Sequence, residues 1–216
     1  MRTRLFTLAA LFGLLGHAEI IDRIAVTIGN RVLTESMLIE QIRLSALYDG
    51  REPDFSPASK RAAAETLIAQ TLLLQEMDDT RYPEPAMKDV IDELRNDVVP
   101  LYEGEAGFPN ALRARRVTEE ELQRFVQRMM RSLSFIDLRF RRGQTVTTDE
   151  IRQYYEGEFR QVWMKKNAGK PIPALEDVTE EIEEVIVGRK TDKALEEWVA
   201  QARQRSEIRF RDEVCQ

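Results

Sequence analysis

A short hairpin near the N-terminus is the feature that most constrains the fold of this chain. In the stretch 19–36, EIIDRIAVTIGNRVLTES, alternating side chains lead into Gly29-Asn30, a tight-turn pair, and apolar residues resume after it. The rest of the chain reads as helical almost throughout, and two strands alone are at best marginally stable in water. A third strand is therefore expected elsewhere in the sequence.

The third strand is expected at the opposite end of the chain. In SEIRFRDE, residues 206–213, Ile208 and Phe210 alternate with charged side chains, which is the period of a half-buried strand. Pairing this run with the hairpin would join the two ends of the chain. The sequence thus predicts a mainly α fold, with many helices and a small antiparallel sheet that combines the N-terminal hairpin with the C-terminal strand.

Capping signals mark where several of the helices begin. Residues 118–121, TEEE, and 147–150, TTDE, are capping boxes, Ser56-Pro57 reads as a cap and first turn, and Thr34 is a candidate cap of the first helix. The helix after Thr118 is expected to bury one face, because its apolar residues recur at steps of three and four. These residues are Leu122, Phe125, Val126, Met129, Leu133, Ile136 and Phe140.

A polar stretch separates this helical region from the last helix. Residues 165–173 contain Gly169, Pro171 and Pro173 and read as a linker or extended turn. The last helix is expected over about residues 175–205, with a kink or a division at Gly188 because glycine weakens a helix interior.

The first eighteen residues are predicted to be a secretory signal peptide. A positively charged start precedes an apolar run, residues 5–15, which is too short to span a bilayer, and small residues follow at 16–18. Cleavage between Ala18 and Glu19 would release a mature, periplasmic chain with no transmembrane segment. A buried first helix is the less favoured alternative, because the run would be apolar on nearly every side of a helix and is preceded by positive charges, as in an export signal.

Composition argues against several classes of function. The chain of 216 residues has a net charge of -6, so attraction to nucleic acid is not expected. Its only histidine, His17, lies in the predicted signal peptide, which excludes Ser-His and Cys-His nucleophile pairs and His-ligated zinc from the mature chain. Its only cysteine, Cys215, has no second cysteine with which to form an internal disulfide. We expect neither a metal nor a cofactor.

An enzyme would have to work with carboxylates alone. Asp89, Asp92 and Glu93, or the acidic run 176–184, could supply them, but their spacing is that of solvated helix surface. No Gly-rich phosphate loop of the P-loop type is present either, which argues against ATP-driven work. The residues therefore favour a non-catalytic protein.

The order of these segments resembles that of the SurA family of periplasmic chaperones. The matching segments are IIDRIAVTIGNRVLTES, LIAQTLLLQEMDD, VTEEELQRFVQRMMRSLSFIDLRFR, VTTDEIRQYYEGEF and IPALEDVTEEIEEVIVGRKTDKALEEWVAQARQRSEIRF. The resemblance implies a SurA N-domain-like fold that forms one chaperone domain over 19–216. Its parts would be a hairpin and helical core over 19–160, a linker over 161–173, and a returning helix and closing strand over 174–216.

The sequence departs from this family at one position in the chain. Members commonly carry one or two parvulin-type prolyl isomerase domains before the returning helix, whereas only residues 160–173 fill that gap here. These are far too few for such a domain, and the mature chain lacks the histidines that a parvulin site contains. Prolyl isomerase activity is therefore not expected, although the family name would imply it.

The resemblance implies an ATP-independent holdase that binds unfolded polypeptides, above all outer-membrane protein precursors, in an apolar groove. Methionine and aromatic side chains suit such a groove because they repack against many sequences. The candidate peptide-binding residues are Phe125, Met129, Met130, Phe135, Tyr154, Tyr155 and Trp163.

Position on the helices divides these candidates into two groups. Phe125 and Met129 share the main apolar face of their helix and are expected in the core, whereas Met130, Tyr155 and Trp163 lie off the main stripes or near the linker and are expected to be exposed. A non-catalytic assembly or scaffold factor for one dedicated envelope partner is the alternative function. The sequence does not separate the two functions, and it leaves the oligomeric state open.

Overall fold

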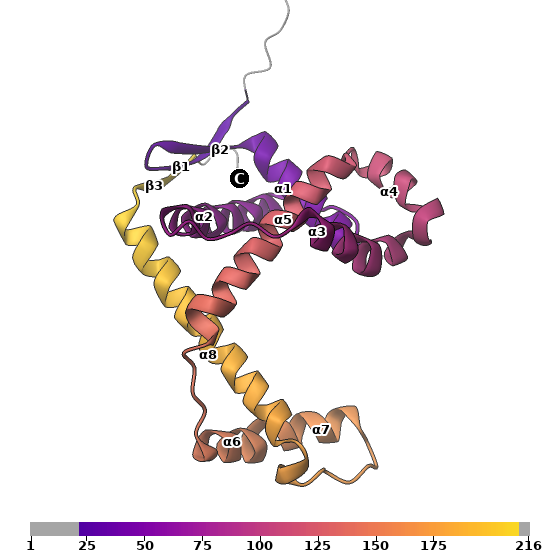
Figure 1. Ribbon diagram of the computed structural model, residues 1–216, viewed down its shortest axis with the longest axis vertical. Coiled ribbons are helices and arrows are strands. Elements are labelled where there is room, and N and C mark those ends of the chain that lie inside the picture. The colour runs from indigo at the N-terminus through magenta and orange to yellow at the C-terminus, as the bar shows by residue number, and fades with distance from the viewer. Residues whose placement is uncertain (1–21, 212–216) are drawn as a thin grey trace, which may run out of the picture.

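The computed structural model describes residues 22–211 and is shown in Figure 1. The predicted signal peptide, its cleavage site between Ala18 and Glu19, and Cys215 lie outside the described residues. As predicted, the fold is mainly helical with a small antiparallel sheet. Among residues 22–211, no helix has the length and apolar character needed to cross a bilayer.

The sheet joins the two ends of the described chain, as the sequence predicted. Its strands are β1 (Ile24–Ile28), β2 (Arg31–Thr34) and β3 (Ile208–Phe210), in the order β2-β1-β3. Gly29 forms the turn between β1 and β2 with a φ of 56°, in the left-handed region that glycine adopts without steric cost. Val26 pairs with Phe210 and Ile28 with Ile208, so the apolar side chains of β1 and β3 share the face that packs on the helices.

The helices follow one another with short connections. They are α1 (Glu35–Tyr48), α2 (Pro57–Asp79), α3 (Met87–Glu93), α4 (Phe108–Arg115), α5 (Glu119–Ile136), α6 (Thr148–Tyr154), α7 (Arg160–Lys166) and α8 (Thr179–Arg205). Single π-helical turns extend α3, α5 and α6, at Leu94–Val98, Asp137–Arg141 and Tyr155–Phe159. Short 3-10 turns lie at Val99–Tyr102, Gly104–Ala106 and Leu175–Asp177.

Both predicted capping boxes are present. The Thr118 hydroxyl accepts a hydrogen bond from the Glu121 N–H at 3.2 Å, and the Glu121 carboxylate accepts one from the Thr118 N–H at 2.7 Å. Thr147 and Glu150 form the same reciprocal pair at 3.3 and 2.9 Å. Each box satisfies two N–H groups at a helix start, which explains why α5 and α6 begin where the sequence predicted.

The first helix is capped by a different residue from the one expected. Thr34 occupies the N-cap position of α1, but its side chain makes no capping hydrogen bond. The carboxylate of Asp22 instead accepts a hydrogen bond from the Ser36 N–H at 3.2 Å and another from the Ser36 hydroxyl. Both bonds lower the pKa of Asp22 because they favour its charged form, and the bond from the Ser36 hydroxyl has the larger effect.

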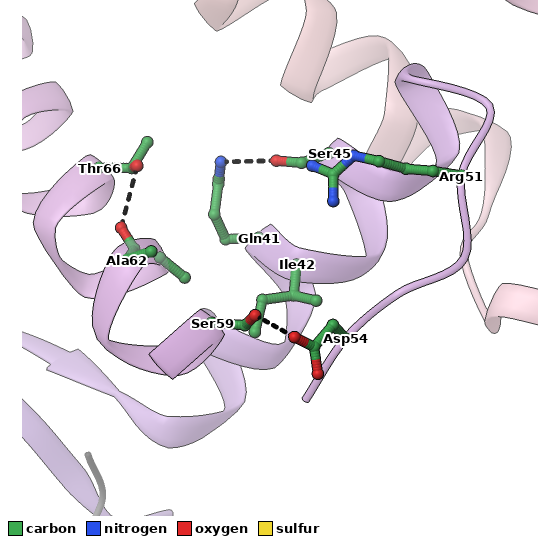
Figure 2. A pocket seen from close by; sticks show the side chains of 9 residues that line it. Gln41, Ile42, Ser45, Arg51, Asp54, Ser59, Ala62 and Thr66 are labelled. Atoms are coloured by element: carbon green, nitrogen blue, oxygen red, sulfur yellow. Dashed lines mark hydrogen bonds between the residues drawn. The ribbon is translucent and has the colours of Figure 1, made fainter. Parts of the chain in front are cut away.

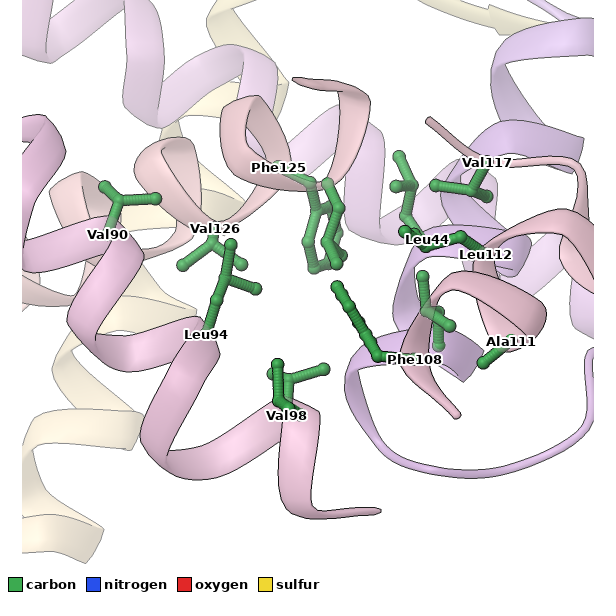
Figure 3. Close-up of a cluster of buried hydrophobic side chains, with 13 residues drawn as sticks. Leu44, Val90, Leu94, Val98, Phe108, Ala111, Leu112, Val117, Phe125 and Val126 are labelled. Atoms are coloured by element: carbon green, nitrogen blue, oxygen red, sulfur yellow. The ribbon is translucent and has the colours of Figure 1, made fainter. Parts of the chain in front are cut away.

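The largest core cluster lies where α1, α3, α4 and α5 meet. Figure 3 shows side chains from all four helices converging on Phe125 of α5. Leu44 of α1, Val90 of α3 and Leu112 of α4 are buried there, and Val126 lies beside Phe125 on α5. A second cluster packs the sheet on α1 and α2.

The predicted apolar face of α5 is only partly buried. Leu122 and Val126 are fully buried, but Leu133 is 58% exposed. The C-terminal half of α5 lies outside the main cluster. There Phe135 packs against Leu73 and Met77 of α2. The buried side of the helix therefore changes along its length, because its neighbours change.

Residues 145–190 form a unit at the end of the molecule away from the sheet, here called the small lobe (Figure 1). It consists of α6, α7 and the first half of α8, with its own buried cluster: Ile151, Phe159, Val178, Ile182 and Ile186. The helix α8 then runs unbroken through Gly188 back to β3, so this glycine does not divide it. Helix α7 covers residues 161–166 of the predicted linker, which leaves the loop to begin at Asn167.

Candidate functional site

The seven candidate residues are divided among separate packing clusters. Outside the small lobe, in the part of the described chain here called the main body, Phe125, Met129 and Met130 belong to one cluster and Phe135 to another. The small lobe contains Tyr154, Tyr155 and Trp163. Phe125 and Phe135 are 7% and 4% exposed, so these two rings pack the interior and do not line a surface. Met129 and Met130 are half-buried against the main cluster.

The aromatic residues of the small lobe form a stack. Tyr155, Phe159 and Trp163 follow at steps of four, with ring centroids 5.7 and 5.9 Å apart and interplanar angles of 17° and 25°. The Tyr155 hydroxyl donates a hydrogen bond to the carbonyl of Pro173 at 2.7 Å, and the Trp163 indole N–H donates one to the carbonyl of Pro171 at 3.0 Å. The stack therefore fixes the loop that leads to α8.

A hollow of about 290 Å³ opens beside this stack. Its volume lies near the lower end of the range for small-ligand pockets, ~300–1,000 Å³. Two of the candidates, Tyr154 and Trp163, line it together with Val162, Ile182 and Val185. Exposed charges of both signs, Lys166 and Glu181, line it as well.

Apolar side chains around this hollow are unusually open to solvent. Of the residues that line it, Val162 and Val185 are 47% and 36% exposed, and Met164, the neighbour of Trp163 on α7, is 53% exposed. Single exposed apolar residues are ordinary, but exposed apolar side chains on the wall of a concave surface make that surface a candidate site of interaction.

Sequence reasoning missed Val162 and Val185. The signal that was available is the run Val162-Trp163-Met164 in a short helix: consecutive helical residues point in directions about 100° apart, so three in a row do not all face one core. Val185 gave no comparable signal, because its exposure depends on where α7 lies.

Basic residues of α8 hold the other helices of the small lobe. The Arg189 guanidinium donates two hydrogen bonds to the Glu158 carboxylate, at 2.8 and 2.6 Å, and lies 4.9 Å from the Tyr154 ring centroid. The Lys190 ammonium contacts Glu150 at 2.6 Å and the carbonyl of Thr145 at 2.7 Å. These contacts set the position of the hollow on α8.

Two of the carboxylates considered for an enzyme site, Asp92 and Glu93, are engaged in local contacts. Asp92 pairs with Lys88 at 2.6 Å, and the hydrogen bond from this lysine lowers the pKa of Asp92. Glu93 accepts a hydrogen bond from the Tyr48 hydroxyl at 2.7 Å. Within the described part of the chain, no three His, Cys, Asp or Glu side chains are grouped as metal ligands would be.

No model of a known protein family matches the chain, and no curated protein matches it. The resemblance to the SurA family stays a prediction from the order of the sequence segments. The functional argument that follows therefore rests on the surfaces of the described residues.

Proposed function

We propose that the protein is a non-catalytic, ATP-independent holdase that binds unfolded polypeptides in the periplasm, with outer-membrane protein precursors as clients. The observation that carries the proposal is the hollow of the small lobe, where Val162 and Val185 are exposed beside Tyr154 and Trp163.

The chemistry of the hollow supports an unfolded polypeptide as its occupant. A space of about 290 Å³ accommodates a large apolar side chain of a client, and valine and aromatic walls impose no hydrogen-bonding pattern on it. Lys166 and Glu181 bring opposite charges to the same surface, so clients of either sign are tolerated. Weak selectivity of this kind is what a holdase needs.

The predicted export of the chain supports the location of the activity. Unfolded outer-membrane proteins cross the periplasm, where a holdase without a nucleotide requirement can protect them. The signal peptide on which this location rests lies outside the described residues, so export is tested separately, by recovery of the Glu19 form from periplasmic extract.

Suppression of aggregation tests the function. A denatured outer-membrane β-barrel protein is diluted into buffer with the chain from Glu19 to Gln216, without nucleotide, and light scattering is recorded. We expect near-stoichiometric chain to suppress scattering, and Val162→Glu to weaken suppression because it places a charge on the wall of the hollow. Met87→Glu is the matched control, since Met87 is 42% exposed on α3 of the main body.

The outcomes separate the two functions that the sequence left open. Suppression that fails in Val162→Glu and persists in Met87→Glu supports the holdase. Absence of suppression by the unsubstituted chain contradicts it and favours an assembly factor for one dedicated partner, which co-purification from periplasm would then identify.

A further inference from the structure

A second concave surface lies on the main body, along the contact between α1 and α2. It consists of two hollows, of about 180 and 310 Å³. Gln41 of α1 lines both of them and so forms the wall between them. Figure 2 shows the smaller hollow, with Gln41 and Ser45 on one side and Ser59 and Thr66 on the other.

The two hollows follow one line along the helix pair. Their lining residues recur at steps of three and four on each helix, which places them on one face. On α1 these are Met37, Gln41 and Ser45, and on α2 they are Ser59, Ala63, Thr66, Gln70 and Leu74. From Ser59 to Leu74 the helix rises ~22 Å, which is the length of about seven residues of extended chain. We call this line the α1–α2 groove.

Gln41 is the unusual residue of the groove. It is only 7% exposed, and its amide nitrogen Nε2 donates a hydrogen bond to the Ser45 hydroxyl at 3.1 Å. Within residues 22–211 no protein group donates a hydrogen bond to its amide oxygen Oε1, and this atom is not among the buried polar atoms that lack a partner, so it faces the open space of the groove. An amide oxygen has acceptor capacity that a bound N–H group can use in place of water, so the groove offers an acceptor to a ligand.

Other polar groups of the groove are also left with bonding capacity. The Thr66 and Thr71 hydroxyls donate to the carbonyls of Ala62 and Leu67 in their own helix, at 3.1 and 2.7 Å, which leaves their oxygens free to accept. The Ser45 hydroxyl accepts from Gln41, and its proton is left to donate. The groove thus offers the Gln41 amide oxygen and the two threonine oxygens as acceptors, and the Ser45 hydroxyl as a donor.

Charges of both signs line each hollow of the groove. Arg51 and Asp54 line the smaller hollow, and Arg128 and Glu40 line the larger one. The apolar walls between them include Ile42, Leu67 and Leu74. A uniformly charged ligand such as a nucleic acid would meet a charge of its own sign in each hollow, which offsets the attraction of the opposite charge, whereas a polypeptide backbone is neutral and carries one donor and one acceptor in each residue other than proline.

We propose that the α1–α2 groove binds an extended polypeptide segment through its main chain, with Gln41 Oε1 accepting a hydrogen bond from a peptide N–H. The proposal rests on the holdase function and adds a second contact to it. Because every client has the same backbone, this contact is independent of client sequence. Alternate side chains of the segment would lie against Leu67 and Leu74.

Backbone methylation tests this contact directly. The probe is a fluorescein-labelled ten-residue peptide of alternating valine and serine, compared with the same peptide methylated on alternate backbone nitrogens. Fluorescence anisotropy gives the two dissociation constants with the Glu19 to Gln216 chain. We expect the methylated peptide to bind about tenfold more weakly, as the loss of a hydrogen bond predicts.

Two substitutions test whether the loss of affinity on backbone methylation arises in the α1–α2 groove. Gln41→Met keeps the length of the side chain and removes the amide, and Thr66→Val removes an acceptor at an exposed position that tolerates change. Each should weaken binding of the unmethylated peptide about fivefold to tenfold and reduce the methylation effect. Gln201→Met, on the exposed side of α8, is the control and should change neither constant. Circular dichroism confirms that each variant is folded.

The outcomes distinguish this inference from the proposed function. Equal binding of the two peptides overturns main-chain recognition while the holdase stands. A methylation effect that both substitutions leave intact places the backbone contact elsewhere and overturns the role of the groove. No binding of either peptide by the unsubstituted chain overturns the role of the groove, and the light-scattering assay then decides the holdase function separately.

Discussion

The ammonium of Lys190 lies 2.6 Å from the carboxylate of Glu150 and so joins α8 to the first turn of α6. The same carboxylate accepts a hydrogen bond from the Thr147 N–H at 2.9 Å. One acidic side chain therefore both caps α6 and fixes it to the returning helix. The charge of this carboxylate therefore supports the packing of α6 on α8 within the small lobe.

The contact predicts how the stability of the protein responds to acid. The hydrogen bond from Lys190, and then that from Thr147, lower the pKa of Glu150 from 4.5 to about 2. A carboxyl group whose pKa is lower in the folded state contributes stability that is complete above pH 4.5 and disappears as the pH falls to about 2. Urea unfolding should show the native chain more stable than Glu150→Gln above pH 4.5, with the difference shrinking toward pH 2. A difference that stays constant over this range would contradict the prediction.

Removal of β3 should destabilise the fold. A chain that ends at Arg205 loses Ile208 and Phe210, together with the hydrogen bond that the Gly29 N–H donates to the carbonyl of Glu207 at 2.9 Å. Loss of two half-buried apolar side chains should lower the free energy of unfolding by about 2–3 kcal/mol. A chain that ends at Arg211 is the matched control. Equal urea midpoints for the two truncated chains would show that β3 does not hold the hairpin.

Phe125 and Leu133 should differ sharply in their effect on stability, although the sequence placed them on one face of the same helix. Phe125→Ala removes a ring that is 7% exposed, and should cost about 3–5 kcal/mol. Leu133→Ala changes a side chain that is 58% exposed and should cost about 0.5 kcal/mol or less. Chemical unfolding measures both values, with Phe125→Leu as the milder variant. Similar costs at the two positions would contradict the packing described for α5.

The emission of Trp163 should report the binding of a client. The chain has two tryptophans, so Trp198→Phe leaves Trp163 as the only one. An apolar side chain in the hollow would displace water from the exposed part of the indole and shift its emission to shorter wavelength. Addition of an unfolded, tryptophan-free client should produce this shift in Trp198→Phe and not in Trp163→Phe. Unchanged Trp163 emission at saturating client would place binding away from the hollow.

Features that depend on neighbouring residues could be predicted from the sequence. Gly29 marked the hairpin turn, and Thr118 and Thr147 marked the starts of two helices, because turn and cap chemistry act over a few residues. The third strand at Ile208–Phe210 could also be predicted, since a lone hairpin requires one.

Features that depend on which helices meet could not be predicted. Leu133 fits the apolar period of α5, but the described residues leave this side chain 58% exposed. Val185 became part of a candidate site only because α7 packs beside α8, and Gln41 only because α1 and α2 leave space between them. Periodicity identifies the apolar side of a helix but not the extent of the partner that buries it.

Site-specific photocrosslinking tests the central claim most directly, namely that unfolded polypeptide binds at the hollow of the small lobe. Benzoylphenylalanine is placed at Val162 or, as the control, at Met87, and each chain is irradiated with a denatured outer-membrane β-barrel protein. The account predicts a crosslinked product from position 162 and little or none from position 87. Product at position 87 with none at position 162 would contradict it.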